Sequence, residues 1–196
     1  HEFEGGRSWY TGGGHTEESY SEPDFLQHIL GGIFYASGDV KGEFDATSEQ
    51  QYQVTVIKEN PAYPMALAVL PSYDVLYIER QGKMHLWNSS TGLISTAAEF
   101  DVDSGREDGL LGIVLDPNFE INSYIYVFYS PRTVEEQRVS RFTFDGVRLN
   151  MDSEDILLRI PVQRSQCCHS GGDLEFGPNG DLYITTGDNV NPFESD

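Results

Sequence analysis

Residues 113–130 read "IVLDPNFEINSYIYVFYS": an apolar run, a turn that contains proline, and a second apolar run that begins with a tyrosine. The same order recurs in "AVLPSYDVLYIER" at 68–80 and in "LEFGPNGDLYITTGD" at 174–188. Two short apolar runs on either side of a tight turn indicate a β-hairpin. The three turns lie roughly 50 residues apart, which is close to the spacing of repeats that fold as four-stranded propeller blades.

Short strands are expected throughout the second part of the chain, because brief apolar segments alternate there with turn residues. We predict strands at 52–58, 65–70, 75–79, 83–88, 110–115, 124–130, 139–144, 156–161, 173–176 and 181–186. The roughly 145 residues in this part would make about three blades, whereas a closed propeller normally has about 4–8. We therefore expect an all-β fold that forms part of a β-propeller.

Residues 1–45 follow a different pattern. Residues 7–11 indicate a short strand, and Ser21-Glu22-Pro23-Asp24 indicates a helix start with a hydroxyl cap and a proline in the first turn. Apolar side chains then recur at helical spacing, and we expect this helix, at 22–37, to be the only long one. Four of its residues are expected to face inward: Phe25, Leu26, Ile29 and Ile33. One strand and one helix are too little to fold alone.

The composition limits the classes of function. A hydrophobic fraction of 38% with 12% aromatic residues indicates a globular protein. The 12 basic and 32 acidic residues give a formal net charge of −20. Nucleic acids and anionic membranes are disfavoured as partners, because binding them requires clustered Lys and Arg. Such acidity suits an extracellular or periplasmic protein that handles neutral ligands.

The ends of the sequence suggest a longer protein. The chain begins at His1 rather than at methionine, and its last residues follow directly on a predicted strand. We therefore expect a processed or incomplete piece. No apolar run reaches the length of a membrane span.

A histidine follows the two cysteines of the chain in "SQCCHSGGDLEFGPNGDLYITTGDN", residues 165–189. A hairpin with a tight turn at 178–180 can bring Asp188 close to His169. A carboxylate beside an imidazole fixes its tautomer and raises its basicity, as a general base requires. The alternative is an ordinary surface or hydrogen-bonded histidine, which is our interpretation of the other four.

Cys167 and Cys168 are adjacent, and their spacing lacks the paired C-x-x-C of a zinc site. They are either two semi-buried thiols or a vicinal disulfide, whose strained geometry is uncommon. Further upstream, Arg106, Glu107 and Asp108 precede a wholly apolar strand. This cluster is either a solvated turn or a set of polar groups directed at the axial channel, where propellers bind ligands.

Two families are similar to parts of this sequence. The stretches "EDGLLGIVLDPNF", "YIYVFYS", "RVSRFTF" and "HSGGDLEFGPNGDLYITTGDN" resemble the glucose/sorbosone dehydrogenase family of six-bladed propeller quinoproteins. "GRSWYTGGGHTEESYSEPDFLQHILGGIFYASG" is similar to the C-terminal end of ThuA-like (trehalose-utilisation) domains, which have an α/β fold. We therefore predict a strand–helix remnant of a ThuA-like domain at 1–45 and the N-terminal part of a six-bladed propeller at 46–196.

The resemblance implies oxidation of an aldose-type sugar by hydride transfer to pyrroloquinoline quinone (PQQ) held with Ca²⁺. His169 falls on the catalytic base and Asp188 on the carboxylate that orients it. Glu107 falls where the glucose enzyme places a glutamine that contacts the cofactor, and Cys168 where it has an aspartate.

The resemblance also implies what lies outside this chain. The calcium ligands and the basic contacts to the quinone are expected beyond residue 196, so we expect the chain alone to be inactive. A sugar substrate and an external electron acceptor are the implied partners. The alternative is a non-enzymatic propeller that binds carbohydrate or a partner protein.

Overall fold

The computed structural model describes residues 2–3, 6–7, 9, 18–37, 55–165 and 169–187. The chain divides into two compact units, residues 1–55 and 56–196, and each is described by itself. The predicted domain boundary at residue 45 falls outside the described residues and stays a prediction.

The first unit contains one long helix. α1 (Pro23–Ser37) follows a single 3₁₀ turn, η1 (Ser19–Ser21), and the two-residue strands β1 (Glu2–Phe3) and β2 (Gly6–Arg7) pair antiparallel. A proline is tolerated at the first helical position because the amide of that residue has no intrahelical partner. The helix predicted at 22–37 is therefore present, and it is the only long one among the described residues.

The buried face of α1 differs from the predicted one. Gly31 and Gly32 are buried, and a Cβ atom on Gly32 would lie 2.1 Å from the ring of Trp9. Of the four residues expected to face inward, Phe25 and Ile29 are half-buried, whereas Leu26 and Ile33 are 46% and 56% exposed. The absence of a side chain at Gly32 lets the indole approach the helix backbone, so the most buried positions of α1 are its two glycines.

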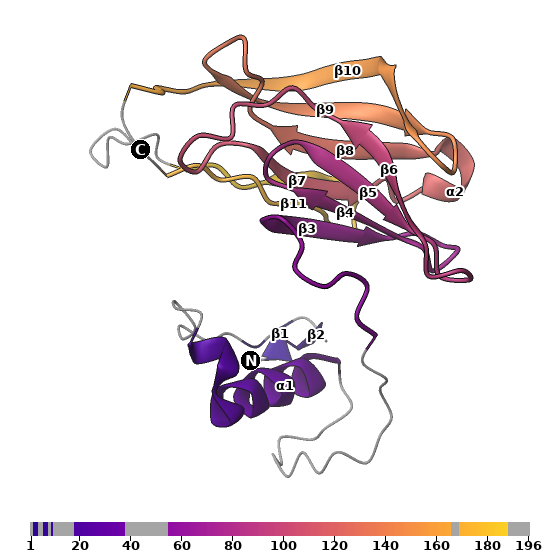
Figure 1. The fold of residues 1–196 in the computed structure, drawn as a ribbon, viewed down its shortest axis with the longest axis vertical. Helices are drawn as coiled ribbons and strands as arrows, with labels where there is room; N and C mark the ends of the chain where they lie inside the picture. The colour runs from indigo at the N-terminus through magenta and orange to yellow at the C-terminus, as the bar shows by residue number, and fades with distance from the viewer. Residues whose placement is uncertain are drawn as a thin grey trace. The chain divides into compact units, whose positions relative to one another are not determined.

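The second unit consists of two four-stranded antiparallel sheets and a hairpin (Figure 1). The first sheet contains β3 (Pro64–Val69), β4 (Val75–Glu79), β5 (Lys83–Trp87) and β6 (Ile94–Glu99). The second contains β7 (Leu110–Leu115), β8 (Tyr124–Tyr129), β9 (Glu136–Phe144) and β10 (Leu149–Pro161). The hairpin pairs β11 (Leu174–Phe176) with β12 (Leu182–Ile184).

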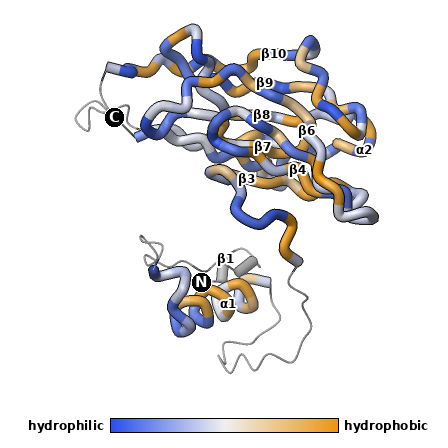
Figure 2. The backbone as a smooth tube through the Cα atoms, in the orientation of Figure 1, coloured by the Kyte–Doolittle hydropathy of each residue, from blue (hydrophilic) through white to orange (hydrophobic). Residues whose placement is uncertain are grey.

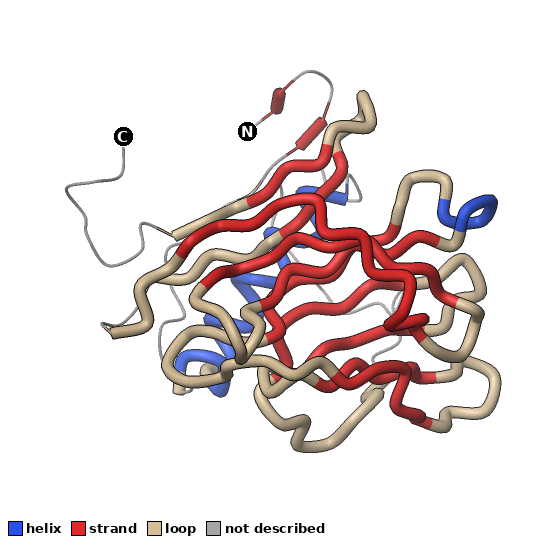
Figure 3. The backbone as a smooth tube through the Cα atoms, turned by 90° about the horizontal axis from the view of Figure 1, so that it is seen from above, coloured by secondary structure: helices blue, strands red, loops and turns tan. Residues whose placement is uncertain are grey.

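The arrangement of these sheets is that of successive propeller blades. Within each sheet the strands are neighbours in chain order. The first strands of the two sheets and of the hairpin lie side by side, because β7 contacts both β3 and β11. In Figure 3 the strands of this unit, drawn red, run in broadly the same direction and are joined by loops. The prediction of an all-β partial propeller is confirmed, with two complete blades and the first hairpin of a third among the described residues.

Four local features differ from the prediction. β6 was not predicted, and residues 55–58, the described part of the strand predicted at 52–58, form no strand. β10 begins seven residues before the predicted start at 156 and contains two register shifts against β9. A one-turn helix, α2 (Phe119–Asn122), lies within the turn between β7 and β8.

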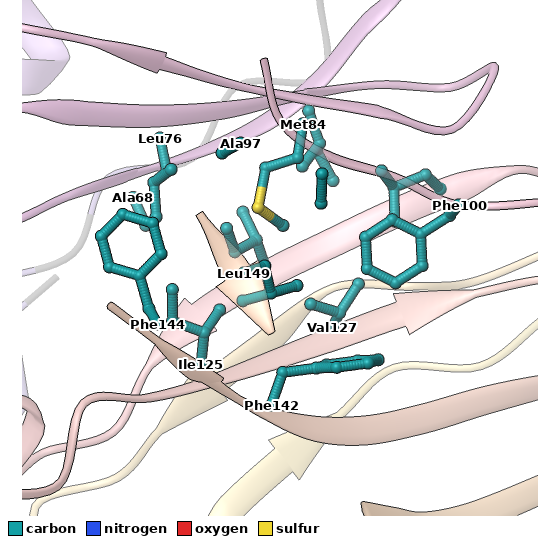
Figure 4. Close-up of a cluster of buried hydrophobic side chains, with 14 of the residues drawn as sticks. Ala68, Leu76, Met84, Ala97, Phe100, Ile125, Val127, Phe142, Phe144 and Leu149 are labelled. Atoms are coloured by element: carbon teal, nitrogen blue, oxygen red, sulfur yellow. The ribbon is translucent and has the colours of Figure 1, made fainter. Parts of the chain in front are cut away.

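The main core lies between the two sheets. Alternate residues of a strand point to opposite faces, so Leu76 from β4 and Met84 from β5 lie across from Ile125 and Val127 of β8 (Figure 4). Ile78 of β4 belongs to the same cluster. All five are fully buried. Figure 2 shows the hydrophobic residues gathered along the strands of both sheets.

A second core lies on the other face of the second sheet. Leu111, Phe128 and Val139 are buried there against Leu174 of the hairpin. The second sheet is therefore apolar on both faces, and the hairpin is fixed against it. This contact brings the loop that precedes β11 next to the loop that precedes β7.

Candidate active site

The loop of residues 103–109 runs along the end of the second sheet where β7 begins. Its path is fixed by backbone hydrogen bonds: Asp103 N–H donates to Ser130 O, and Ser130 N–H donates to Gly109 O. Arg106 has a φ of +57°, a left-handed conformation that non-glycine residues rarely adopt. The turn presents three consecutive side chains at this end of the sheet: Arg106, Glu107 and Asp108.

Asp108 is the centre of a polar network. Its carboxylate accepts hydrogen bonds from the hydroxyls of Ser130 and Ser170, both at 3.1 Å, and from Gln137 Nε2 at 3.4 Å. Arg164 Nε donates to its second oxygen at 3.1 Å. The side chains of Asp108 and Arg164 are 13% and 14% exposed, so this ion pair is largely shielded from water. Asp108 therefore joins β8 and β9 to the loop before β11.

Arg164 also reaches beyond Asp108. Its Nη2 donates to the carbonyls of Pro131 and Glu136, and its Nε lies 3.7 Å from the carboxylate of Asp103. The guanidinium thus fixes the segment that leaves β10 against the second sheet. Two carboxylates face one cation here, which partly neutralises both.

Glu107 contacts the second loop through its backbone. The amide N–H groups of His169 and Ser170 both donate to Glu107 Oε2, the latter at 3.2 Å. His169 has a φ of +67°, so it too is in the left-handed region. Two successive amides that point to one side form a concave anion site, and the carboxylate of Glu107 occupies it.

Close backbone approaches hold the second loop in place. A Cβ atom on Gly112 of β7 would lie 2.0 Å from Gly172 O, and one on Gly187 would lie 1.4 Å from His169 O. Neither position could carry a side chain without moving the backbone. The loop that contains His169 is therefore packed between the start of the second sheet and the residues that follow β12.

These residues line a cleft of about 270 Å³. Its lining includes the following residues: Asp103, Arg106, Glu107, Asp108, Gln137, Arg164, His169, Ser170 and Gly187. The cleft therefore contains an exposed imidazole, three carboxylates and two guanidinium groups at the end of the two neighbouring blades. Such a mixture suits a small polar ligand.

The structure brings together two of the four predicted site residues. His169 and Glu107 both line the cleft and are joined by a hydrogen bond. Cys168 and Asp188 lie outside the described residues, so their predicted roles stay predictions. Among the described residues, no group of three or more His, Cys, Asp or Glu side chains could hold a metal ion.

Sequence reasoning left several residues of the cleft unassigned, and Asp108 and Arg164 are the most connected of them. Asp108 was noted only as part of a charged cluster, and Arg164 was not noted at all. The first had a usable signal, because a carboxylate directly before a buried strand must find partners. Arg164 had none, since its partner Asp108 lies 56 positions earlier in the chain.

Comparison with known families decides the relationship of this chain. The family model described as glucose/sorbosone dehydrogenase matches residues 61–196, which include both sheets and the cleft. The chain belongs to the glucose/sorbosone dehydrogenase family. A second model, described as trehalose utilisation, matches residues 1–36 and supports the ThuA-like assignment of the first unit.

Several members of this family are similar in sequence. Quinoprotein glucose dehydrogenase B of Acinetobacter calcoaceticus is 27% identical over 159 residues, 74% of this chain and 33% of that protein. Aldose sugar dehydrogenase YliI of Escherichia coli is 28% identical over 142 residues, 69% of this chain and 38% of that protein. This chain therefore spans well under half the length of these curated relatives.

Solved structures agree with the fold. The PQQ-bound aldose sugar dehydrogenase of Streptomyces coelicolor superposes with a TM-score of 0.61 at 27% identity, covering 70% of this chain and 42% of that one. The apo-form of the soluble aldose sugar dehydrogenase of E. coli gives a TM-score of 0.54 at 25% identity, covering 66% of this chain and 39% of that one.

Proposed function

We propose that this chain supplies the first blades of a quinoprotein sugar dehydrogenase and that the cleft around His169 binds the sugar hydroxyl that is oxidised. The observation that carries the proposal is the position of His169. Its imidazole is exposed in a cleft, while its backbone is held in a left-handed conformation by Glu107. Strained backbone of this kind is found at functional sites, where the surroundings over-determine it.

PQQ carries three carboxylates, so its site must not present uncompensated negative charge. In this cleft Asp103 and Asp108 face Arg164, and Glu107 accepts two amide N–H groups. Arg106 makes no ion pair with a carboxylate within the described ranges, and its exposed guanidinium lines the cleft. The residues present therefore fit an anionic cofactor, and Arg106 would contribute to holding it.

The residues would divide the reaction between them. His169 would accept the proton of the sugar hydroxyl at an imidazole nitrogen, a contribution of about 10²–10⁴ in rate. Asp188 would orient the ring through the other nitrogen, and Cys168 would form part of the wall. When bound, the quinone supplies the hydride acceptor that no amino-acid side chain can provide.

Calcium, the electron acceptor and the cellular location belong to the same proposal. We expect the Ca²⁺ ligands in later blades of the complete protein, and an external acceptor that reoxidises the cofactor. The family relationship and the acidic composition support an extracellular or periplasmic location. None of the helices in the described part of the chain combines the length and hydrophobicity needed to cross a membrane.

A second function has specific support. Hedgehog-interacting protein of mouse, whose name states that it interacts with a protein, is 27% identical over 139 residues, 61% of this chain and 19% of that protein. A protein similar in sequence thus carries the name of a protein-binding function. On this alternative the same face would bind a partner protein or a carbohydrate without oxidising it.

The test uses the complete protein, loaded with PQQ and Ca²⁺, in a dye-coupled assay against a panel of aldoses. We expect quinone-dependent oxidation of at least one aldose, and a loss of about 10²–10⁴ in kcat for His169→Ala with quinone affinity retained. His28→Ala, in α1, is the matched control and should leave kcat unchanged. Failure to bind the quinone would favour the binding-protein alternative, and full activity of His169→Ala would exclude the imidazole as the base.

A further inference from the structure

We infer that Glu107 is a positioning residue for His169 and does not contact the cofactor directly. This inference refines the proposed function, on which its catalytic part rests. The geometry on which it depends is independent of any cofactor. Both amide hydrogen bonds end on the same carboxylate oxygen of Glu107, and both come from the turn that carries the imidazole.

The backbone of His169 requires such support. A left-handed conformation disfavours a residue with a side chain by about 1 kcal/mol or more, so the turn needs contacts that select it. Two successive amides make a small anion site, and charge-assisted hydrogen bonds of this type are about twice as strong as neutral ones. A carboxylate satisfies both amides with one oxygen, which a shorter or apolar side chain could not do.

A second hydrogen bond from the same loop also holds the turn that carries His169. Ser170 Oγ donates to Asp108, which is itself fixed by Ser130, Gln137 and Arg164. Glu107 therefore holds the backbone of His169 and Ser170, and Asp108 holds the hydroxyl of Ser170. The rigid second sheet is connected in this way to the position of the imidazole.

The position of the Glu107 carboxylate also determines how it would affect binding of the quinone. A carboxylate directed at an anionic quinone would oppose its binding. Placed against the amides, the same carboxylate is compensated. Arg106, whose exposed guanidinium donates one hydrogen bond to Arg164 O at 3.1 Å, lines the cleft as the cation of this loop. The expected consequence is that Glu107 affects the rate of proton transfer and leaves quinone affinity nearly unchanged.

The experiment compares Glu107→Ala, Glu107→Gln and Ser170→Ala in the complete protein. The control is Glu120→Ala, an exposed carboxylate on α2 at the opposite end of the second sheet. The first readout is hydrogen–deuterium exchange of the peptide containing His169 and Ser170 in cofactor-free protein. We expect exchange to rise about tenfold in Glu107→Ala, less in Ser170→Ala and Glu107→Gln, and not at all in the control.

The second readout separates positioning from cofactor contact. Titration with PQQ should give dissociation constants within about twofold of wild type for every variant, while kcat falls by about 10–10² in Glu107→Ala. Glu107→Gln, which keeps an acceptor oxygen, should recover most of kcat. A tenfold weaker quinone affinity with unchanged exchange would overturn the inference and make Glu107 a cofactor contact.

Failure of the proposed function gives a different result. If His169→Ala kept full activity, or the protein did not bind the quinone, the proposed chemistry would be wrong. The exchange measurement would still decide whether Glu107 holds the turn. Unchanged exchange in Glu107→Ala would overturn the inference whatever the activity.

Discussion

At the scale of single residues, the cleft depends on one largely buried cation. Arg164 separates the carboxylates of Asp103 and Asp108, and it also donates to two backbone carbonyls. Removing one partner of a shielded ion pair leaves the other charge desolvated and uncompensated. The hydroxyl and amide donors around Asp108 would remain and would limit the effect.

We predict that Arg164→Met lowers the free energy of unfolding of the complete protein by about 1–3 kcal/mol. The measurement is chemical denaturation. Arg159→Met is the matched control, because Arg159 is 52% exposed and Glu136, its partner, retains Arg138. Equal effects of the two variants would show that the shielding of Arg164 has no energetic consequence.

Whether a site residue could be predicted depends on how far apart in the sequence it and its partner lie. His169 and Glu107 lie in stretches whose local order matches the family, so the sequence indicated them. The link between Glu107 and the amide of His169, and that between Asp108 and Arg164, join residues roughly 60 positions apart. No local pattern encodes such pairs, because the first exists only after the hairpin has packed on the second sheet and the second only after that sheet has formed.

At the scale of elements, strand prediction succeeded where apolar runs are rich in β-branched or aromatic residues. β8 reads "YIYVFY" and is buried on both faces, and its position was predicted within one residue. β6 reads "ISTAAE", where serine and alanine have weak β-propensity. It forms a strand because pairing with β5 satisfies its backbone, a tertiary effect that the local sequence does not carry.

Asp74 joins two turns of the first sheet. Its Oδ1 accepts hydrogen bonds from Ser89 N–H at 2.7 Å and Ser89 Oγ at 2.9 Å, and Asn88 Nδ2 lies at 3.4 Å. The backbone and side-chain hydrogen bonds from Ser89 hold the pKa of this carboxyl below its ordinary value of 3.8. A folded-state pKa below the unfolded value stabilises the fold above the unfolded pKa and is lost as pH falls through the folded pKa.

We predict that Asp74→Asn lowers the free energy of unfolding by about 1 kcal/mol at neutral pH. The difference from wild type should persist down to about pH 5 and shrink as the pH falls below 3.8. Denaturant titrations of the complete protein at several pH values measure it, with the exposed Asp152→Asn as control. A difference independent of pH would mean that the charge of Asp74 contributes nothing.

At the scale of the whole molecule, the edge strand β3 leaves one apolar side of the first sheet exposed, while its neighbour β4 is buried. Met65, Leu67 and Val69 of β3 are 44%, 58% and 54% exposed, all on the face opposite the main core. In the second sheet, by contrast, both faces are covered by neighbouring elements. A propeller blade packs on both faces once the ring is closed, and this chain spans 33% and 38% of two curated relatives.

The effect of a charged residue at Leu67 should therefore depend on whether another blade covers β3. Expressed alone, residues 56–196 should self-associate through the β3 face at micromolar concentration, because an exposed apolar strand at a sheet edge is a template for association. Leu67→Lys should make that piece more monomeric by sedimentation velocity.

In the complete protein, where we expect another blade to cover Leu67, the same change should lower the free energy of unfolding by about 2–4 kcal/mol, since a lysine would be buried without a partner. Leu93→Lys, at a leucine that is 71% exposed just before β6, is the control and should change neither quantity. Leu67→Lys with no effect on the complete protein would mean that this face stays in solvent and that the ring does not close over it.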